Sequence, residues 1–373
     1  PLQQRNMAEF SKAYNRDNPG VDVTCNLTSI PYDAYKASII SRFEAGTKTD
    51  VLYVEDNWFS LWENAGWIVP IEQYRPYIAE KYKSDLVPGV LDALISRNPK
   101  YEGKLIGLPY YVDTLSYMYN KDMTQKAGLS EPPKTWDELL DQAEKVKKAG
   151  ILDRPISFAW KLAEWTFEET TFAMLYSRGE RFLNPDGTAN LEEGSAMHKL
   201  LQWIADGAVK RKVIDTKSAE FVSEDVLNAL KGRVCAFTVL PSYFLFFTNI
   251  SKAPGAGQVV NAMIPGTGDT TELVRFYAMT SQAATRGDDF LDALAKFMEW
   301  EGGKYDRMGT GEEVYIKPKE YALNDGLPFG LLGLFEDPAV KNFMSGWIDP
   351  EIFTAQAKKT IYIEAKWKLY WED

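Results

Sequence analysis

The sequence predicts an α/β protein with about two domains. Helical and strand-like segments alternate along the chain, which is typical of this class. The chain has 373 residues, more than the roughly 250–300 that one hydrophobic core usually spans. Apolar residues make up 45% and charged residues 25%, as in ordinary globular proteins. No apolar run approaches the ~20 residues of a membrane span.

The N-terminal segments are predicted from apolar spacing and from chain breakers. Apolar side chains recur at helical spacing over residues 7–14, and the Asn-Pro-Gly triplet at residues 18–20 predicts the end of that first helix. Alternation over residues 21–25 predicts a strand, and a helix is predicted over residues 33–45. The apolar run at residues 50–54 predicts a buried parallel strand.

Turn and cap signals place the next elements. Residues 105–108 and the alternating residues 110–119 are predicted to be extended, and Asp122 is predicted to cap a short helix after them. Thr135 and Glu138 form a capping-box pattern, which predicts a helix that continues to the next glycine. The apolar positions of this helix share one face and are predicted to be buried: Trp136, Leu139, Leu140, Ala143 and Val146.

Charge and residue counts exclude several kinds of function. With 42 basic and 53 acidic side chains the net charge is −11, which argues against nucleic acid as a partner because phosphate contacts need a basic face. The single histidine, His198, excludes multi-histidine metal sites. Cys25 and Cys235 are too isolated for a zinc site or a disulfide framework, and both are predicted to be small buried residues. We therefore expect no metal and no cofactor.

Polar side chains follow the strand predicted at residues 50–54. Glu55, Asp56, Asn57 and Trp58 stand at its carboxyl end, which is where ligands bind in open α/β sheets. Two carboxylates, an amide and an indole could hold a hydroxyl-rich ligand there. The alternative is a polar loop in which Asp56 or Asn57 caps the next short helix.

Four sequence blocks within residues 101–140 carry a resemblance to a known family. They are Glu-Gly-Lys-Leu-Ile-Gly-Leu-Pro from residue 102, Leu-Ser-Tyr-Met-Tyr-Asn-Lys-Asp from residue 115, Ala-Gly-Leu from residue 127 and Pro-Pro-Lys-Thr-Trp-Asp-Glu-Leu from residue 132. In this order and spacing the chain resembles the extracellular solute-binding proteins of ABC importers, the family that contains maltose-binding protein. Weaker matches extend the resemblance over nearly the whole chain, at residues 65–70, 184–187 and 283–303.

This resemblance implies a two-lobe periplasmic-binding-protein fold, type II-like, with ligand bound between lobes that a three-segment hinge joins. Proline and glycine breaks place the crossings near residues 110–113, 265 and 311–318. The strand with which the family begins is expected to be missing, because Pro1 already stands at a helix start, so its ligand contacts are not named. The expected lobes are residues 1–110 with 266–312, and residues 111–265 with 313–373.

The resemblance also implies binding residues on the predicted hinge. Asp113 matches an acidic binding position of maltose-binding protein, and its carboxylate could accept two hydroxyl hydrogen bonds. The alternative is a hinge carboxylate paired with a lysine. Tyr111 or Tyr110 could flank the ligand, or both could simply pack in the strand. As strand neighbours the two tyrosines are predicted to point to opposite faces, which makes them a poor pair for chelating iron.

Three aromatic side chains complete the ligand-binding set that the resemblance implies. Tyr243 stands where the family places a stacking aromatic, and a flat ring can cover the apolar face of a sugar. Trp165 and Trp160 fall in a loop of the second lobe where the family often has an aromatic residue. Any of the three could instead belong to the core. The glutamates nearby are expected on a solvated helix face: Glu164, Glu168 and Glu169.

The function that the resemblance implies is capture of a sugar, sugar derivative or polyol and its delivery to the permease subunits of an ABC importer. The protein is expected to be a periplasmic or extracytoplasmic monomer without enzymatic activity. We expect no signal peptide within this sequence, and a lipid anchor is left open as an alternative. The alternatives are the same fold binding a polyamine or ferric iron, a glycoside-acting enzyme with two carboxylates across the scissile bond, and a scaffold protein.

Overall fold

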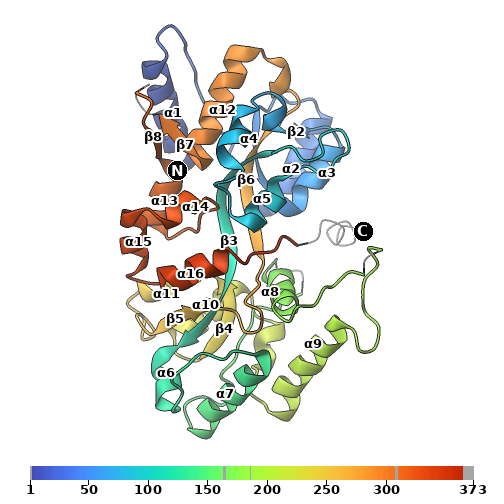
Figure 1. Cartoon of the computed structure of the whole chain (residues 1–373), viewed down its shortest axis with the longest axis vertical. Coiled ribbons are helices and arrows are strands. Elements are labelled where there is room, and N and C mark those ends of the chain that lie inside the picture. Colours follow the sequence, from blue (N-terminus) through green and yellow to red (C-terminus); the bar gives the residue numbers. More distant parts are fainter. Residues whose placement is uncertain (1, 163–164, 185, 307–309, 364–373) are drawn as a thin grey trace.

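One long strand, β3 (Gly107–Asn120), runs between an upper and a lower group of elements (Figure 1). The computed structural model describes residues 2–162, 165–184, 186–306 and 310–363. The elements combine helices with a six-stranded sheet, so the prediction of an α/β protein is confirmed.

The sheet is built around β3, and its named strands all pair antiparallel. β6 pairs with the first half of β3, from Gly107 to Thr114, whereas β4 and β5 pair with its second half, from Leu115 onward. β1 and β2 pair with β6. One continuous sheet therefore links the two groups of elements. Its other strands are β1 (Val51–Glu55), β2 (Ile68–Val69), β4 (Phe237–Pro241), β5 (Val259–Ala262) and β6 (Glu272–Thr280).

Two strand predictions are wrong. Residues 51–54 of the predicted run do lie in a strand, but β1 runs antiparallel to β6 rather than parallel to a neighbour. An apolar run indicates burial and carries no information on strand direction. Residues 21–31 form no regular strand, because their backbone is held by side chains of the first helix: Asn15 Oδ1 accepts from Val23 N and Ser11 Oγ from Cys25 N. As a result Cys25 is only half-buried.

The upper group packs helices around β1, β2 and β6. Its core contains Trp62, Tyr82 and Phe276, all fully buried. The first helix was predicted to end at residues 18–20 and ends at Asp17, which confirms that stop signal. The elements of this group are α1 (Leu2–Asp17), α2 (Tyr32–Glu44), α3 (Asp56–Asn64), η1 (Ile71–Gln73), α4 (Tyr77–Tyr82), α5 (Pro88–Leu94), η4 (Ala283–Thr285), α12 (Asp288–Gly302), β7 (Lys304–Asp306) and β8 (Glu313–Tyr315).

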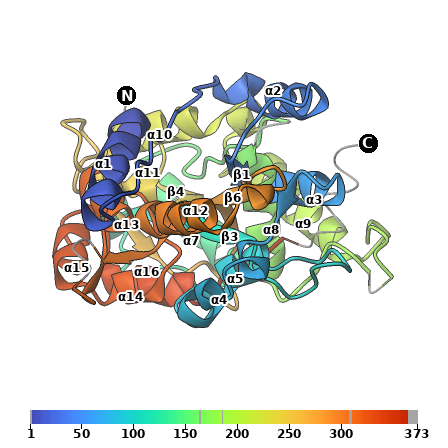
Figure 2. The same cartoon turned by 90° about the horizontal axis from the view of Figure 1, so that it is seen from above.

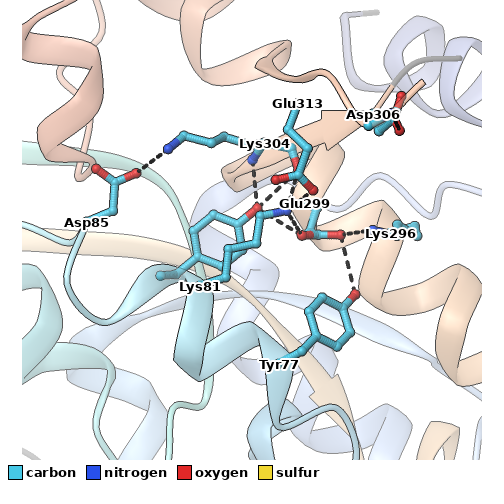
Figure 3. A network of polar contacts seen from close by, with 10 residues as sticks. Tyr77, Lys81, Asp85, Lys296, Glu299, Lys304, Asp306 and Glu313 are labelled. Carbon is cyan, nitrogen blue, oxygen red and sulfur yellow. Dashed lines mark hydrogen bonds and ion pairs between the residues drawn. The ribbon is translucent and has the colours of Figure 1, made fainter. Parts of the chain in front are cut away.

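The buried carboxylate of Glu299 on α12 connects several elements of this upper group (Figure 3). Its oxygens accept hydrogen bonds from Lys81 and Tyr82 on α4 and from Lys296 on its own helix. Lys81 also pairs with Glu313, so the same lysine ties strand β8 to α4. Such a fully hydrogen-bonded buried charge holds its surroundings in one arrangement. The network therefore links α4, α12 and the strands β7 and β8.

The lower group forms a second core around β4, β5 and the end of β3. Helix α7 (Trp136–Lys148) begins and ends as predicted, and its five predicted core positions are all buried. Thr135 Oγ1 accepts a hydrogen bond from Glu138 N, as in a capping box. Glu138 Oε2 accepts from the N–H of Lys134 and not from that of Thr135, the partner that a capping box would use. The other elements are α6 (Lys121–Lys126), α8 (Trp165–Tyr176), α9 (Ala196–Ala205), the π-helical turn η2 (Asp206–Lys210), η3 (Thr216–Ala219), α10 (Ser223–Lys231) and α11 (Tyr243–Asn249).

One helix cap was assigned to the wrong residue. Asn120, the last residue of β3, caps α6, since its Oδ1 accepts from Met123 N. Asp122 instead lies in the first turn of α6, where it pairs with Lys126 and Arg233. The local sequence offers two acceptors two residues apart, and the path of β3 decides which of them reaches the helix.

Four late helices pack beside β3. Seen from above, α1 and these helices lie on the side of β3 that faces away from α2 and α3 (Figure 2). Phe246 of α11, Phe335 and Trp347 are buried there and extend the upper core toward the lower group. The helices are α13 (Lys317–Asp325), α14 (Leu332–Phe335), α15 (Pro338–Met344) and α16 (Pro350–Ala357).

Candidate functional site

A buried guanidinium, that of Arg275 on β6, gathers several of the predicted site residues. Arg275 is only 5% exposed. Its Nε lies 3.2 Å from Glu55 Oε1, and its Nη1 donates to Asp113 Oδ2. The guanidinium carbon lies 5.0 Å from the ring centre of Tyr111 and 5.8 Å from that of Trp165. We call these five residues the Arg275 cluster.

Strand register explains why the cluster forms. Arg275 is directly opposite Glu55 on β1 and Tyr111 on β3. Asp113 lies two residues further along β3 and therefore points to the same face of the sheet. Helix α8 begins at Trp165 and lies beside β6 in Figure 1, so it brings an aromatic ring from the lower group to this face. Residues of both groups and of the shared strand thus meet at one guanidinium.

The α8 glutamates are not on a solvated face as expected. Glu169, one helical turn after Trp165, is only 3% exposed, and its Oε2 accepts from Thr271 Oγ1 at 3.1 Å. The spacing of four residues puts Trp165 and Glu169 on the same side of α8. Glu168 is half-buried, and Glu164 lies outside the described residues.

The carboxylate of Glu55 is fully used inside the protein. Besides Arg275, it accepts from the hydroxyls of Tyr32, at 3.1 Å, and Tyr53, at 3.0 Å. Burial raises the pKa of Tyr53 well above its usual range, so this hydroxyl stays protonated and remains a donor. Glu55 is therefore a residue that holds Arg275 and two tyrosines in place.

Asp113 differs from Glu55, because only one of its two oxygens is used. The residue is fully buried, and Oδ2 accepts from Arg275. Within the described part of the chain Oδ1 has no hydrogen-bond partner. Asp113 thus has the cationic partner that the hinge interpretation required, although this partner is an arginine and not a lysine, and it keeps one acceptor for another group.

Asp56 lies away from the Arg275 cluster although it is next to Glu55 in sequence. It begins α3, is 1% exposed, and lies close enough to Glu272 for its charge to act on that carboxyl. Glu272 is three residues from Arg275 on β6, so it points to the opposite face of the sheet. Burial is the main cause that raises the pKa of Glu272 to about 8, and the negative charge of Asp56 also raises it. A hydrogen bond from Thr360 lowers this pKa and offsets part of the effect. The predicted polar loop is therefore divided between two faces.

Asn57 and Trp58 continue α3 behind Asp56. The ring of Trp58 lies 6.2 Å from that of Tyr32 and 6.3 Å from that of Tyr53, the two tyrosines that hold Glu55. Asn57 is half-buried, and its Oδ1 has no hydrogen-bond partner among the described residues. Trp58 therefore supports the cluster from behind.

Hydrogen bonds to backbone carbonyls connect the sequence neighbours of Trp160 and Tyr243 to α8 and β3. Thr166 Oγ1 donates to the carbonyl of Ala159, which holds the residue before Trp160 against the first turn of α8. The ring of Trp160 is stacked on Phe158. Tyr243 begins α11 and follows Ser242, whose N–H donates to the carbonyl of Thr114, next to Asp113.

The two neighbouring tyrosines of β3 do not point to opposite faces as predicted. The register with β6 shifts between Pro109 and Tyr111, and the rings of Tyr110 and Tyr111 lie 4.9 Å apart. A bulge adds a residue to one strand and interrupts the alternation of faces. Tyr110 packs against Tyr277 and Tyr321.

Arg275 itself was not predicted from the sequence. It is the one charged residue between Leu273 and Thr280, an apolar run in the middle of a strand. A lone arginine at such a position must be paired when the strand is buried, because an unpaired buried charge is costly. This signal could have identified the residue, but not its two carboxylate partners, which are more than 160 positions away.

Sequence similarity places the chain in a known family. The model of the bacterial extracellular solute-binding proteins matches residues 3–300, and the chain belongs to that family. It is 27% identical over 371 residues to a predicted binding protein of Brucella abortus (strain 2308), which covers 95% of this chain and 84% of that protein. A shorter match of 80 residues, 35% identical, covers 21% of this chain and 18% of the sn-glycerol-3-phosphate-binding periplasmic protein UgpB of Rhizobium meliloti (strain 1021).

The fold is that of two-lobe periplasmic binding proteins. The structure of the sugar-binding protein MalE from Xanthomonas citri superposes with a TM-score of 0.76 at 20% identity, over 100% of this chain and 86% of that one. The predicted family and fold are thereby confirmed. Among the described residues no helix combines the length and the apolar character that crossing a membrane requires.

Proposed function

We propose that this chain is the solute-binding component of an ABC importer, that it captures a sugar, sugar derivative or polyol between its lobes, and that it delivers this ligand to permease subunits. The observation that carries the proposal is the Arg275 cluster. It combines aromatic rings with buried acceptors at the place where strand β3 passes from one group of elements to the other. We also infer that the protein is an extracytoplasmic monomer and that its lobes have the predicted boundaries.

The chemistry of the cluster suits a hydroxyl-rich ligand. A tyrosine or tryptophan ring can cover the apolar C–H face of a sugar, while carboxylate oxygens accept from its hydroxyls. Trp165 and Tyr111 supply rings, and Asp113 supplies an open acceptor. The sugar-binding protein from Xanthomonas citri, which shares the fold, supports a carbohydrate as the ligand class. In the proposed set Glu55 positions Arg275, and Asp56 lies on the other face of the sheet. The whole set comprises Glu55, Asp56, Asn57, Trp58, Tyr111, Asp113, Trp160, Trp165 and Tyr243.

Binding is proposed to be coupled to closure of the lobes. Glu55 comes from the upper group, Trp165 from the lower group, and Asp113 from the strand that joins them. A ligand held between elements of both groups gains its full set of contacts only when the two groups approach each other, so it favours the closed state. No bond is made or broken in this cycle, in line with a family of binding proteins.

A binding screen tests the proposal directly. The intact chain is titrated with maltose, mannitol, monosaccharides and oligosaccharides, with spermidine and ferric citrate as the alternative ligand classes. A ligand at a thousand times its dissociation constant should stabilise the fold by about 4 kcal/mol, which a thermal-shift measurement detects. A hit with spermidine or iron alone would replace the carbohydrate proposal with the cationic alternative, and hydrolysis of a glycoside would replace it with the enzyme.

A variant pair then locates the site. Trp165→Ala should weaken binding of the best carbohydrate at least tenfold, because it removes the ring beside Arg275. The matched control is Trp67→Ala, which removes a tryptophan that is stacked on Phe43 in the upper group. Equal affinities for the two variants would place the ligand elsewhere.

A further inference from the structure

Arg275 is the cation of the cluster, and two of its three nitrogens already face carboxylates. Its Nε faces Glu55 and its Nη1 faces Asp113, and the rings of Tyr111 and Trp165 lie beside the guanidinium. An anionic ligand is normally held by a guanidinium whose forked N–H groups are free to bind two oxygens. In this protein a phosphate or carboxylate that approached Nε or Nη1 would first have to displace an internal carboxylate.

The charges around the guanidinium also oppose an anion. Two carboxylates face one guanidinium, which leaves the cluster one charge negative. Glu169 is buried on the same face and adds a further acidic group. Like charges repel strongly in a buried site, where water cannot screen them. The cluster therefore favours a ligand that is neutral or positively charged.

The open oxygen of Asp113 specifies what the ligand must bring. Oδ1 is fully buried and has no partner among the described residues, so a hydrogen-bond donor is needed to satisfy it. A hydroxyl or an ammonium group can donate to this oxygen. A deprotonated phosphate or carboxylate group offers only acceptors, so the anionic group itself cannot satisfy Asp113.

We propose that the ligand carries no anionic group and that its hydroxyl or ammonium donor binds Asp113 Oδ1. In this proposal Glu55 and Asp113 together prevent phosphates and sugar acids from binding to Arg275. This inference rests on the proposed function and narrows its substrate class. It also separates the chain from the partly similar glycerol-phosphate-binding relatives, whose name specifies a phosphorylated ligand. The 80 residues shared with such a relative are then a match in fold and not in ligand.

Matched series of ligands test the proposal that an anionic group prevents binding, which we call the charge rule. Isothermal titration at constant ionic strength compares glucose, glucosamine, glucuronate and glucose 6-phosphate, and likewise glycerol with sn-glycerol 3-phosphate and maltose with maltobionate. Whichever neutral compound binds, its acidic counterpart should bind at least 100-fold more weakly, and the amino counterpart within about tenfold. An acidic counterpart that binds as tightly as the neutral compound would overturn the inference.

Asp113→Asn tests the mechanism of exclusion. The amide keeps the shape of the side chain but removes one negative charge, so the variant should bind inorganic phosphate or sn-glycerol 3-phosphate at least tenfold more tightly than the wild-type protein. Asp141→Asn is the matched control, because it removes the same charge from an exposed position on α7 that pairs with Arg211. Phosphate affinity that Asp113→Asn does not increase, or that Asp141→Asn increases equally, would overturn the mechanism.

The two proposals fail in different ways. If no compound of either charge binds the wild-type protein, the carbohydrate function is refuted, and the charge rule is then decided by the phosphate titrations of Asp113→Asn. If Asp113→Asn does not fold, as judged by circular dichroism, the comparison of neutral with acidic ligands on the wild-type protein decides the charge rule alone.

Discussion

Replacing Arg275 by methionine is the sharpest test of the buried cluster. Met fills a similar volume but donates no hydrogen bond, so Arg275→Met leaves Glu55 and Asp113 buried without their common cation. Glu55 retains its two tyrosine donors, whereas Asp113 loses its only side-chain partner among the described residues. Removing one partner of a buried ion pair typically costs about 3–5 kcal/mol, and we expect the loss of unfolding free energy to fall in this range.

Calorimetry can resolve a change of this size. An unfolding entropy of about 2.1 cal/mol/K per residue amounts to about 0.8 kcal/mol/K for 373 residues that unfold in one transition. The melting temperature of Arg275→Met should therefore fall by about 4–6 °C at neutral pH. Urea unfolding of the same samples gives the free-energy change independently.

An exposed ion pair provides the control. Arg286 pairs with Asp50 on the surface, where its side chain is 51% exposed, and Arg286→Met should cost about 1 kcal/mol or less. Adding Asp113→Asn to Arg275→Met should recover part of the stability, because the unpaired charge is then removed. If Arg275→Met costs no more than Arg286→Met, the reasoning about the cluster is refuted.

Two further predictions concern stability. Burial raises the pKa of Glu272 to about 8. Between about pH 4.5 and 8 the folded chain therefore keeps a proton that the unfolded chain releases. The stability that this carboxyl contributes is lost as the pH rises through that window. Glu272→Gln should reduce the decline of unfolding free energy over this window by up to about 1.4 kcal/mol per pH unit, and the exposed Asp92→Asn should not. Gly107→Ala should destabilise by about 1–3 kcal/mol or more in urea unfolding, because a Cβ there would lie 2.0 Å from the carbonyl oxygen of Tyr277. Gly346→Ala, exposed and with its nearest atom at 3.3 Å, should change stability little.

The sequence predicted the elements whose signals are local. Helix α7 was placed correctly because a threonine cap, an acidic first turn and five apolar positions on one face all lie within 14 residues. The resemblance of residues 101–140 succeeded for a related reason. These residues contain the whole of β3, the strand around which the sheet is built.

Prediction from the sequence failed where a residue or strand interacts with a partner that is far away in the sequence. It could not show that β1 runs antiparallel, since its neighbour β6 lies more than 200 residues away. It grouped Glu55 with Asp56 because they are adjacent, whereas the strand ends between them and sends one to Arg275 and the other toward Glu272. It also missed the bulge at Pro109, which is set by pairing with β6 and not by local composition.

The two interpretations of Asp113, hinge carboxylate and ligand acceptor, are compatible because a carboxylate has two oxygens. Oδ2 is held by Arg275, and Oδ1 is open among the described residues. Asp113 also lies one residue before the point where β3 exchanges β6 for β4 as its partner, between Thr114 and Leu115. A ligand donor at Oδ1 would thus bind at the joint between the two groups of elements. Free energy gained there acts directly on how the groups are oriented, so recognition and closure would depend on the same atom.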